Sequence, residues 1–179
     1  MAKLLTVPNK TLRLKSQPIE KITPKVKAIA ETLIEMMGET YNGLMAIGIA
    51  APQIGKLVRM FVYRPNPYSD APDYVIVINP ELVYAKGKVI LNESCLSIPG
   101  KVFKVQRHKI VKLSGLNLDG EQRTFKGRGL IAQELEHELN HLDGILIDEI
   151  GRTDNGRRAK SNQAARWQSS SRFSERFYP

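Results

Sequence analysis

Hydrophobic residues recur at helical spacing after Thr23 and Pro24. Threonine followed by proline is typical of a helix start, because the hydroxyl caps free backbone N–H groups and proline fits the first helical position. The apolar positions that follow share one helical face: Val26, Ile29, Leu33, Ile34 and Met37. The pattern predicts an amphipathic helix from residue 24 to about residue 38.

A second helical pattern lies in residues 129–144. Leu135, Leu139 and Leu142 recur at helical spacing in a stretch rich in Leu, Glu, Gln and Ala. A glycine directly after such a stretch, here Gly144, is a common helix C-cap. We therefore expect a second helix here.

Shorter stretches are rich in Val, Ile and aromatic residues, as strands are. They are residues 57–63, 74–79, 82–91, 102–113, 112–118, 122–126 and 145–147. Asp119 and Gly120 predict a tight turn before 122–126, and Gly87 makes 82–91 a hairpin or a bulged strand. Most strands precede the second helix, which predicts an α+β fold with mainly antiparallel sheets packed around that helix.

The second helix carries His137, Glu138 and His141. Residues four apart on a helix lie on one face, so the two imidazoles can bind one divalent metal ion. The intervening Glu138 can then reach a water molecule on that ion. The alternative is a solvated amphipathic helix that carries two histidines without a metal. Only three histidines occur in the chain, and two of them are here, which favours the metal site.

A catalytic site of this kind needs a third protein ligand. Downstream of His141 the candidates are Asp148, Glu149 and Asp154. Upstream, the single cysteine, Cys95, precedes turn-forming residues, and a thiolate with two imidazoles suits zinc or ferrous iron. The pattern of residues leaves the choice open, because a lone cysteine is also a common small core residue.

Residues 41–56 (YNGLMAIGIAAPQIGK) are rich in small residues and uncharged in the middle. Such a series lets backbone approach a ligand closely, although a tight packing segment has the same composition. The glycine spacing does not fit a phosphate-binding loop. Gln53 is the side chain in this stretch that can donate a hydrogen bond to a ligand.

Length and composition fit a cytoplasmic globular protein. The 179 residues contain 42% hydrophobic and 25% charged residues, and one cysteine suits a reducing compartment. We expect neither a signal peptide nor a membrane span. We divide the chain into a catalytic domain, residues 1–150, and a basic tail, residues 151–179. The net charge of +9 suits a polyanionic partner such as nucleic acid, although a basic tail can also be merely solvated.

Residues 102–113 should form a strand with an exposed cationic face. Its basic side chains, with the lysine just before it, are Lys101, Lys104, Arg107, His108, Lys109 and Lys112. We interpret His108 as a surface or hydrogen-bonded histidine rather than a metal ligand.

Three blocks of the chain resemble, in order, the motifs of the peptide deformylase family. The family pattern Gly-x-Gly-Leu-Ala-Ala-x-Gln appears as residues 46–53 (AIGIAAPQ), and Glu-Gly-Cys-Leu-Ser as residues 93–97 (ESCLS). The pattern Gln-His-Glu-x-Asp-His appears as residues 136–141 (EHELNH). Weaker similarity extends from about residue 5 to residue 147, and the tail lies outside it.

The resemblance implies that Cys95, His137 and His141 hold one divalent metal ion, most commonly Fe(II) in this family, although Zn, Ni or Co fit the same ligands. It implies that Glu138 moves a proton, while Gln53 and the Leu96 backbone N–H stabilise the oxyanion. The substrate implied is the N-formylmethionyl end of a nascent polypeptide, and formate is released.

Four substitutions depart from the family motifs: Ala46, Ser94, Glu136 and Asn140. The first two are small and should be tolerated. Asn140 replaces an aspartate that supports the metal ligands, and such partners matter 10–100-fold. We expect Arg107, which aligns with the arginine that faces this aspartate, to lose its ion pair.

The resemblance also implies a methionine side-chain pocket lined by Ile47, Leu91, Leu130 and Glu134, with Gly48 binding the extended peptide backbone. Glu134 stands where the family has an uncharged residue. Its carboxylate either turns out to solvent, the usual behaviour of glutamate, or narrows and polarises the pocket.

We therefore predict a monomeric, cytoplasmic peptide deformylase. One alternative is a zinc peptidase with a third ligand downstream of His141, in which Cys95 is dispensable. Another is a ribosome- or RNA-binding protein with this fold and weak or altered-specificity activity, although the intact Glu138 argues against it. The basic tail could dock the enzyme on the ribosome.

Overall fold

The computed structural model describes residues 2–38, 40–41, 44–69 and 73–153. The basic tail from residue 154 onward therefore lies outside the described residues. The elements in chain order are η1 Lys10–Arg13, α1 Pro24–Met37, β1 Thr40–Tyr41, β2 Leu44–Met45, β3 Gly48–Ala50, η2 Ala51–Ile54, β4 Met60–Tyr63, β5 Val75–Cys95, β6 Ile98–Leu116, β7 Gln122–Arg128, α2 Leu130–Leu142 and α3 Ile147–Ile150.

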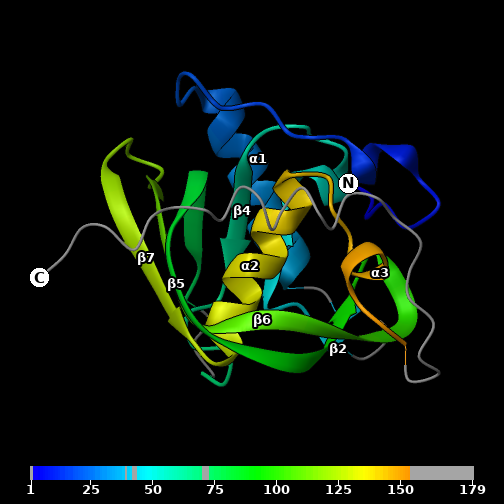
Figure 1. Ribbon diagram of the computed structural model, residues 1–179. Helices are drawn as coiled ribbons and strands as arrows, with labels where there is room; N and C mark the ends of the chain where they lie inside the picture. The colour runs from blue at the N-terminus through cyan, green and yellow to red at the C-terminus, as the bar shows by residue number, and fades with distance from the viewer. Residues whose placement is uncertain (1, 39, 42–43, 70–72, 154–179) are drawn as a thin grey trace, which may run out of the picture.

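The main sheet of the described residues has five strands in the order β3-β4-β5-β6-β7, and every neighbouring pair in it is antiparallel. The predicted α+β class is thus confirmed. Figure 1 shows α2 in the middle of the molecule, with β5 and β7 on one side of it and α3 on the other.

β4 is covered on both faces, which explains why its sequence, MFVY, is apolar without alternation. Met60 and Val62 pack in a cluster that includes α1 residues. Phe61 and Tyr63 point the other way, into a cluster with the apolar side of α2. The central strand therefore separates two hydrophobic layers.

α1 agrees with the prediction at both ends. The Thr23 side chain accepts a hydrogen bond from the Val26 N–H, Pro24 is the first helical residue, and Gly38 is the C-cap. Leu33 and Met37 are buried against the sheet. This helix is a packing element, as its sequence indicates.

β5 is one long strand where the sequence suggested two. It continues from Val75 to Cys95 through irregularities at Ile78/Glu81 and Leu82/Tyr84. Asn79 has a positive φ of 49° there, and its side-chain amide forms two hydrogen bonds of 2.8 Å with the Ile19 backbone. These bonds stabilise the bulge, so the strand bends without ending.

β5 and β6 form a long hairpin that turns directly after Cys95, which pairs with Ile98. The site cysteine therefore lies at the hairpin tip. The next hairpin has its turn at the predicted Asp119 and Gly120, where Gly120 has a φ of 82° and β6 pairs with β7.

α2 is buried along most of its length although half its residues are polar. Its apolar face, Ala132, Leu135, Leu139 and Leu142, packs on β4 to β7. The helix ends as predicted, with Gly144 at a φ of 70° directly after the Asp143 C-cap. The other buried face carries the polar residues described below.

The predicted strand 145–147 is wrong. Residues Ile147–Ile150 form the short helix α3, and Leu146 and Ile147 are buried beside the hairpin tip. A short apolar run cannot distinguish strand from helix by itself. The acidic Asp148 and Glu149 in the first turn favour the helix, because they interact favourably with its positive end.

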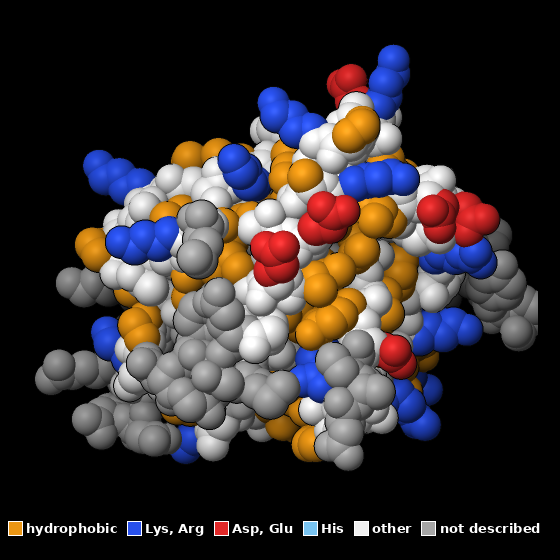
Figure 2. Space-filling view, turned by 180° about the vertical axis from the view of Figure 1, so that it is seen from behind, with side chains coloured by type: hydrophobic (Ala, Val, Ile, Leu, Met, Phe, Trp, Pro, Cys, Tyr) orange, Lys and Arg blue, Asp and Glu red, His pale blue; other side chains and the backbone are white. Residues whose placement is uncertain are grey.

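The described helices include none that is long and apolar enough to cross a membrane. Figure 2 shows one face of the molecule, on which Lys and Arg side chains lie dispersed around the outline among hydrophobic and acidic ones. Among the described side chains on this face, the positive charge is therefore spread out rather than gathered in one patch.

Candidate metal centre and active site

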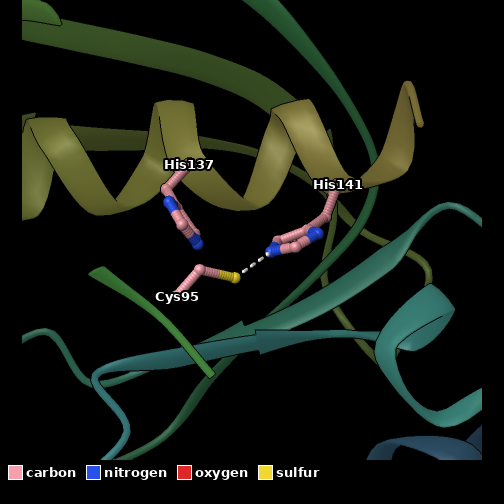
Figure 3. A group of neighbouring side chains, drawn as sticks. All are labelled: Cys95, His137 and His141. Carbon is pink, nitrogen blue, oxygen red and sulfur yellow. Dashed lines mark hydrogen bonds between the residues drawn. The ribbon is translucent and has the colours of Figure 1, made fainter. Parts of the chain in front are cut away.

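Cys95, His137 and His141 come together between the hairpin tip and α2. Their potential ligand atoms all lie within 4.8 Å of one another, and all three residues are buried. Cys95 Sγ is 3.2 Å from His141 Nε2. Figure 3 shows the thiol pointing from the end of its strand towards the two imidazoles on the helix.

The donor set fits a divalent metal ion. One sulfur and two imidazole nitrogens suit Fe(II) or Zn and leave room for a further ligand. Glu138 Oε2 and His141 Nδ1 are buried without a hydrogen-bond partner among the described residues. Buried polar atoms rarely stay unpaired, which indicates that the site accommodates additional polar groups.

The downstream candidates for a third ligand lie elsewhere. Asp148 and Glu149 both form ion pairs with Arg13, and neither belongs to the cluster. Asp154 is outside the described residues. The structure therefore favours Cys95 over the acidic alternatives.

The environment of Cys95 favours the thiolate. Burial raises the pKa of the thiol, but the charge of His141 and a hydrogen bond with His137 outweigh it and bring the pKa down to about 5. The thiolate is the form that binds metals.

Behind His137 lies a buried ion pair. His137 Nδ1 is 2.6 Å from Glu93 Oε1, and Arg107 donates to both oxygens of Glu93. This contact fixes the ring so that Nε2 faces the cluster. Burial alone would raise the pKa of Glu93, but the hydrogen bonds and charge of Arg107, with His137, hold it well below its usual range.

Arg107 does not belong to the exposed cationic face, so that part of the prediction is wrong. Its side chain is among the largest fully buried ones. Phe103, Val105 and Arg107 alternate inwards along β6, and Arg107 thus reaches the core side. The ion pair expected to be lost at position 140 is replaced by a hydrogen bond to Asn140 Oδ1 at 2.6 Å, and Arg107 has Glu93 as its ion-pair partner.

His108 is a hydrogen-bonded histidine, as expected. Its Nδ1 is 2.7 Å from Glu136 Oε1, and its backbone N–H donates to Glu136 Oε2 at 2.8 Å. Glu136 is fully buried. The glutamate that replaces the family's glutamine thus joins α2 to β6.

Glu138 and Gln53 face the cluster from two elements. Glu138 is 1% exposed, and burial together with the neighbouring charge of Glu134 raises its pKa well above the usual value. Gln53 Oε1 accepts a hydrogen bond from the Ala50 N–H at 2.8 Å, and its Nε2 donates to Ser97 Oγ at 3.2 Å. The amide is thus oriented with its nitrogen towards the hairpin tip.

A cavity of about 530 Å³ opens onto this cluster. Of the residues predicted to bind substrate or oxyanion, it is lined by Ile47, Gly48, Gln53, Leu96, Leu130 and Glu134, together with Cys95, His137 and Glu138. Leu91 is not among the lining residues and lies half-buried on β5 opposite Val105. Gly48 to Ala50 form β3, an edge strand of the described sheet.

Glu134 faces the cavity rather than solvent. A Cβ atom added to Gly48 would fall on Glu134 Oε1, so the carboxylate lies against the β3 backbone. Burial raises the pKa of Glu134, although the charge of His137 and a hydrogen bond with Glu138 act in the opposite direction.

Sequence reasoning missed several residues of this site. They are Glu93, Ser97 and Gln133, which support the cluster, and Asn92, Pro99 and Lys101, which line the cavity. The alternation of residues 103, 105 and 107 on one strand face was the available signal for the Arg107–Glu93 pair, since a buried arginine needs an acidic partner.

Comparisons with known proteins agree with this geometry. The family model of polypeptide deformylase matches residues 1–155. A peptide deformylase of Thermodesulfovibrio yellowstonii is 36% identical over 144 residues, covering 80% of this chain and 85% of the relative. One of Dehalococcoides mccartyi is 38% identical over 153 residues, covering 85% and 87%.

Among solved structures, a peptide deformylase from Legionella pneumophila superimposes with a TM-score of 0.78 at 29% identity and covers 94% of this chain and 98% of that one. The Thermotoga maritima enzyme gives a TM-score of 0.73 at 30% identity, covering 84% and 97%. The chain therefore belongs to the polypeptide deformylase family and is a metal-dependent N-terminal deformylase.

Proposed function

We propose that this enzyme removes the formyl group from the N-terminal methionine of nascent polypeptides, with Cys95, His137 and His141 as ligands of Fe(II). The observation that carries the assignment is the buried cysteine–histidine cluster beside Glu138, at a cavity open to a peptide. The same ligands also accept Zn, Ni or Co.

The bound ion would supply a Lewis acid that lowers the pKa of a water molecule and polarises the formyl carbonyl. Glu93 would keep His137 in the orientation that it needs as a ligand, because it contacts the opposite ring nitrogen at 2.6 Å. Arg107 would hold Glu93 in turn.

Glu138 would act as the proton carrier. It would take a proton from the attacking water and deliver it to the leaving amine of methionine. Its unpartnered Oε2 supports this role, because among the described residues nothing competes with a reactant for that atom. A carboxyl whose pKa is raised by burial is also a better proton acceptor than an exposed one.

Gln53 Nε2 and the Leu96 backbone N–H would stabilise the oxyanion. Each preorganised donor of this kind is typically worth about 3 kcal/mol in the transition state. The Gln53 amide is held by its oxygen at the Ala50 N–H and by one N–H at Ser97 Oγ, which leaves the second N–H of Nε2 as the donor on the cavity side.

The substrate would lie along β3 as an added strand. β3 is an edge strand of the described sheet, and Gly48 brings bare backbone to the cavity wall. The proposed contacts of the first side chain are Ile47, Leu91, Leu130 and Glu134, of which all but Leu91 line the cavity.

We further propose a cytoplasmic monomer that consists of a catalytic domain, residues 1–150, and a basic tail, residues 151–179, which docks on the ribosome. The charge of the tail supports a polyanionic partner. Its start is anchored: the backbones of Lys104 and Arg152 exchange hydrogen bonds of 2.8 and 3.0 Å. Removing the residues after Arg152 should weaken salt-sensitive ribosome binding and spare activity on short peptides.

The function is tested by anaerobic formate release from a formyl-Met peptide, with metal analysis of the same sample. Wild type should contain one metal ion per chain and release formate. His137→Ala and His141→Ala should lose both metal and activity. His108→Gln is the matched control and should keep them, because His108 lies outside the cluster and the glutamine amide can still donate a hydrogen bond to Glu136. Full activity without bound metal would contradict the proposal.

A further inference from the structure

The described residues that line the cavity include the acidic side chains Glu93, Glu134 and Glu138. Glu93 supports the proposed metal site and Glu138 is the proposed proton carrier, whereas Glu134 has no role in the proposed reaction. It lies on α2 one turn before His137 and Glu138, so its carboxylate shares their side of the helix. Ile47, Leu96 and Leu130 line the same cavity. The Glu134 carboxylate thus lies beside apolar side chains in a cavity whose polar lining residues include Gln133 and the exposed Lys101.

The Glu134 carboxylate forms no ion pair in the described part of the chain. Glu93, which also lines this cavity, differs from Glu134 because it forms an ion pair with Arg107. Its neighbour is instead another acidic side chain, Glu138, since both carboxylates lie against the backbone of Gly48. Glu134 is half-buried, and a first side chain in the cavity would withdraw its carboxylate further from water, which is unfavourable without a paired group. A ligand with a positive or hydrogen-bond-donating group should therefore be favoured here.

The space beside the Gly48 backbone is occupied by the inward-facing carboxylate of Glu134. A Cβ at residue 48 would collide with Glu134 Oε1 and lie 3.1 Å from Glu138 Cγ and Oε1. The glutamate therefore fills the space between α2 and β3 next to the proposed peptide path. A first side chain in the cavity would pass close to its carboxylate.

We propose that Glu134 is a specificity-determining residue that lets this enzyme deformylate peptides whose first side chain ends in a cation or hydrogen-bond donor, such as lysine or glutamine, besides methionine. The inference rests on the proposed peptide site and deepens it by naming a substrate class. An unpaired carboxylate selects such groups and disfavours a wholly apolar side chain.

The test compares kcat/KM of metal-loaded wild type, Glu134→Leu and Glu134→Gln on formyl-Met-Ala-Ser, formyl-Lys-Ala-Ser and formyl-Gln-Ala-Ser. The ratio of the lysine to the methionine peptide should fall about 100-fold in Glu134→Leu, because the lysine ammonium group then lacks its charged partner in the cavity. Glu134→Gln should lose the lysine preference and keep part of the glutamine preference. Glu31→Leu, the same change at an exposed site on α1, should leave all ratios unchanged.

A second measurement is independent of turnover: the affinity of the product peptides Lys-Ala-Ser and Met-Ala-Ser for wild type and Glu134→Leu, by titration calorimetry. Loss of lysine-peptide affinity in the variant supports the proposal. Equal ratios in both proteins, in kinetics and in binding, overturn it. If metal-loaded wild type releases no formate from any peptide, the proposed function fails, and calorimetry still decides the role of Glu134.

Discussion

The two polar regions around α2 differ in how their charges are balanced. On the supporting side, Glu93 contacts Arg107 and His137, and Arg107 also reaches Asn140. On the cavity side, the carboxylates of Glu134 and Glu138 both lie against Gly48, and neither forms an ion pair within the described residues. Complete pairing fixes a ligand in one geometry, whereas an unpaired carboxylate is available to a substrate or a proton.

The comparison also explains how the departures from the family motifs are accommodated. Asn140 removes a negative charge next to Arg107, yet the arginine keeps Glu93 as its ion-pair partner. Glu136 adds a negative charge one turn earlier, and that charge meets His108. The supporting side thus remains satisfied after both substitutions.

The largest effect should follow from removing the buried arginine of the supporting side. Arg107→Leu leaves Glu93 buried without its counter-charge, which should lower the free energy of unfolding of the metal-free protein by about 3–5 kcal/mol. Urea unfolding measures it. Arg123→Leu is the control, because its ion pair with Glu121 is exposed and should contribute nothing measurable. Similar losses in the two variants would refute the contrast between buried and exposed pairs.

The cavity side is tested by the substitution Gly48→Ala. The new methyl group must displace Glu134 and push against Glu138, and misplacing a reacting group by about 1 Å can reduce turnover by about 100-fold. Steady-state kinetics on formyl-Met-Ala-Ser give the result. Adding Glu134→Ala should restore part of the rate, because the closest clash is then gone. Unchanged activity in the single variant would show that residue 48 has space to spare.

The smallest effect is expected from Asn140→Asp, which adds one negative charge to the supporting side. A closer negative charge should strengthen binding of the divalent ion by about tenfold, the lower end of the range for such supporting residues. Competition with a chelator measures it. Weaker metal binding in the variant would indicate that the new carboxylate draws Arg107 away from Glu93.

Local patterns predicted the parts of the site that one element supplies. The four-residue spacing of His137 and His141 predicted a shared helix face, and the residues after Cys95 indicated a strand end. The structure has Cys95 at a hairpin tip beside both rings. Which distant ligand completes the cluster depends on how the hairpin folds over α2, and local spacing carries no information on that.

The errors have physical causes as well. Arg107 was assigned to an exposed face because basic residues usually are exposed, although its position in the alternation with Phe103 and Val105 indicated the interior. Glu134 was expected to favour solvent for the same reason. In both cases the neighbours, Glu93 for one and Gly48 for the other, come from other segments and make the inward position possible.

The position of Cys95 at the hairpin tip affects the thermal stability of the enzyme. Cys95 and His141 are 46 residues apart in the chain, so an ion bound by both, as proposed above, would close a loop in the manner of a crosslink. Closing a loop of that size with a disulfide is worth about 4 kcal/mol through the restricted unfolded chain. Cells that exhaust their supply of the ion would therefore accumulate an enzyme that is heat-sensitive as well as inactive.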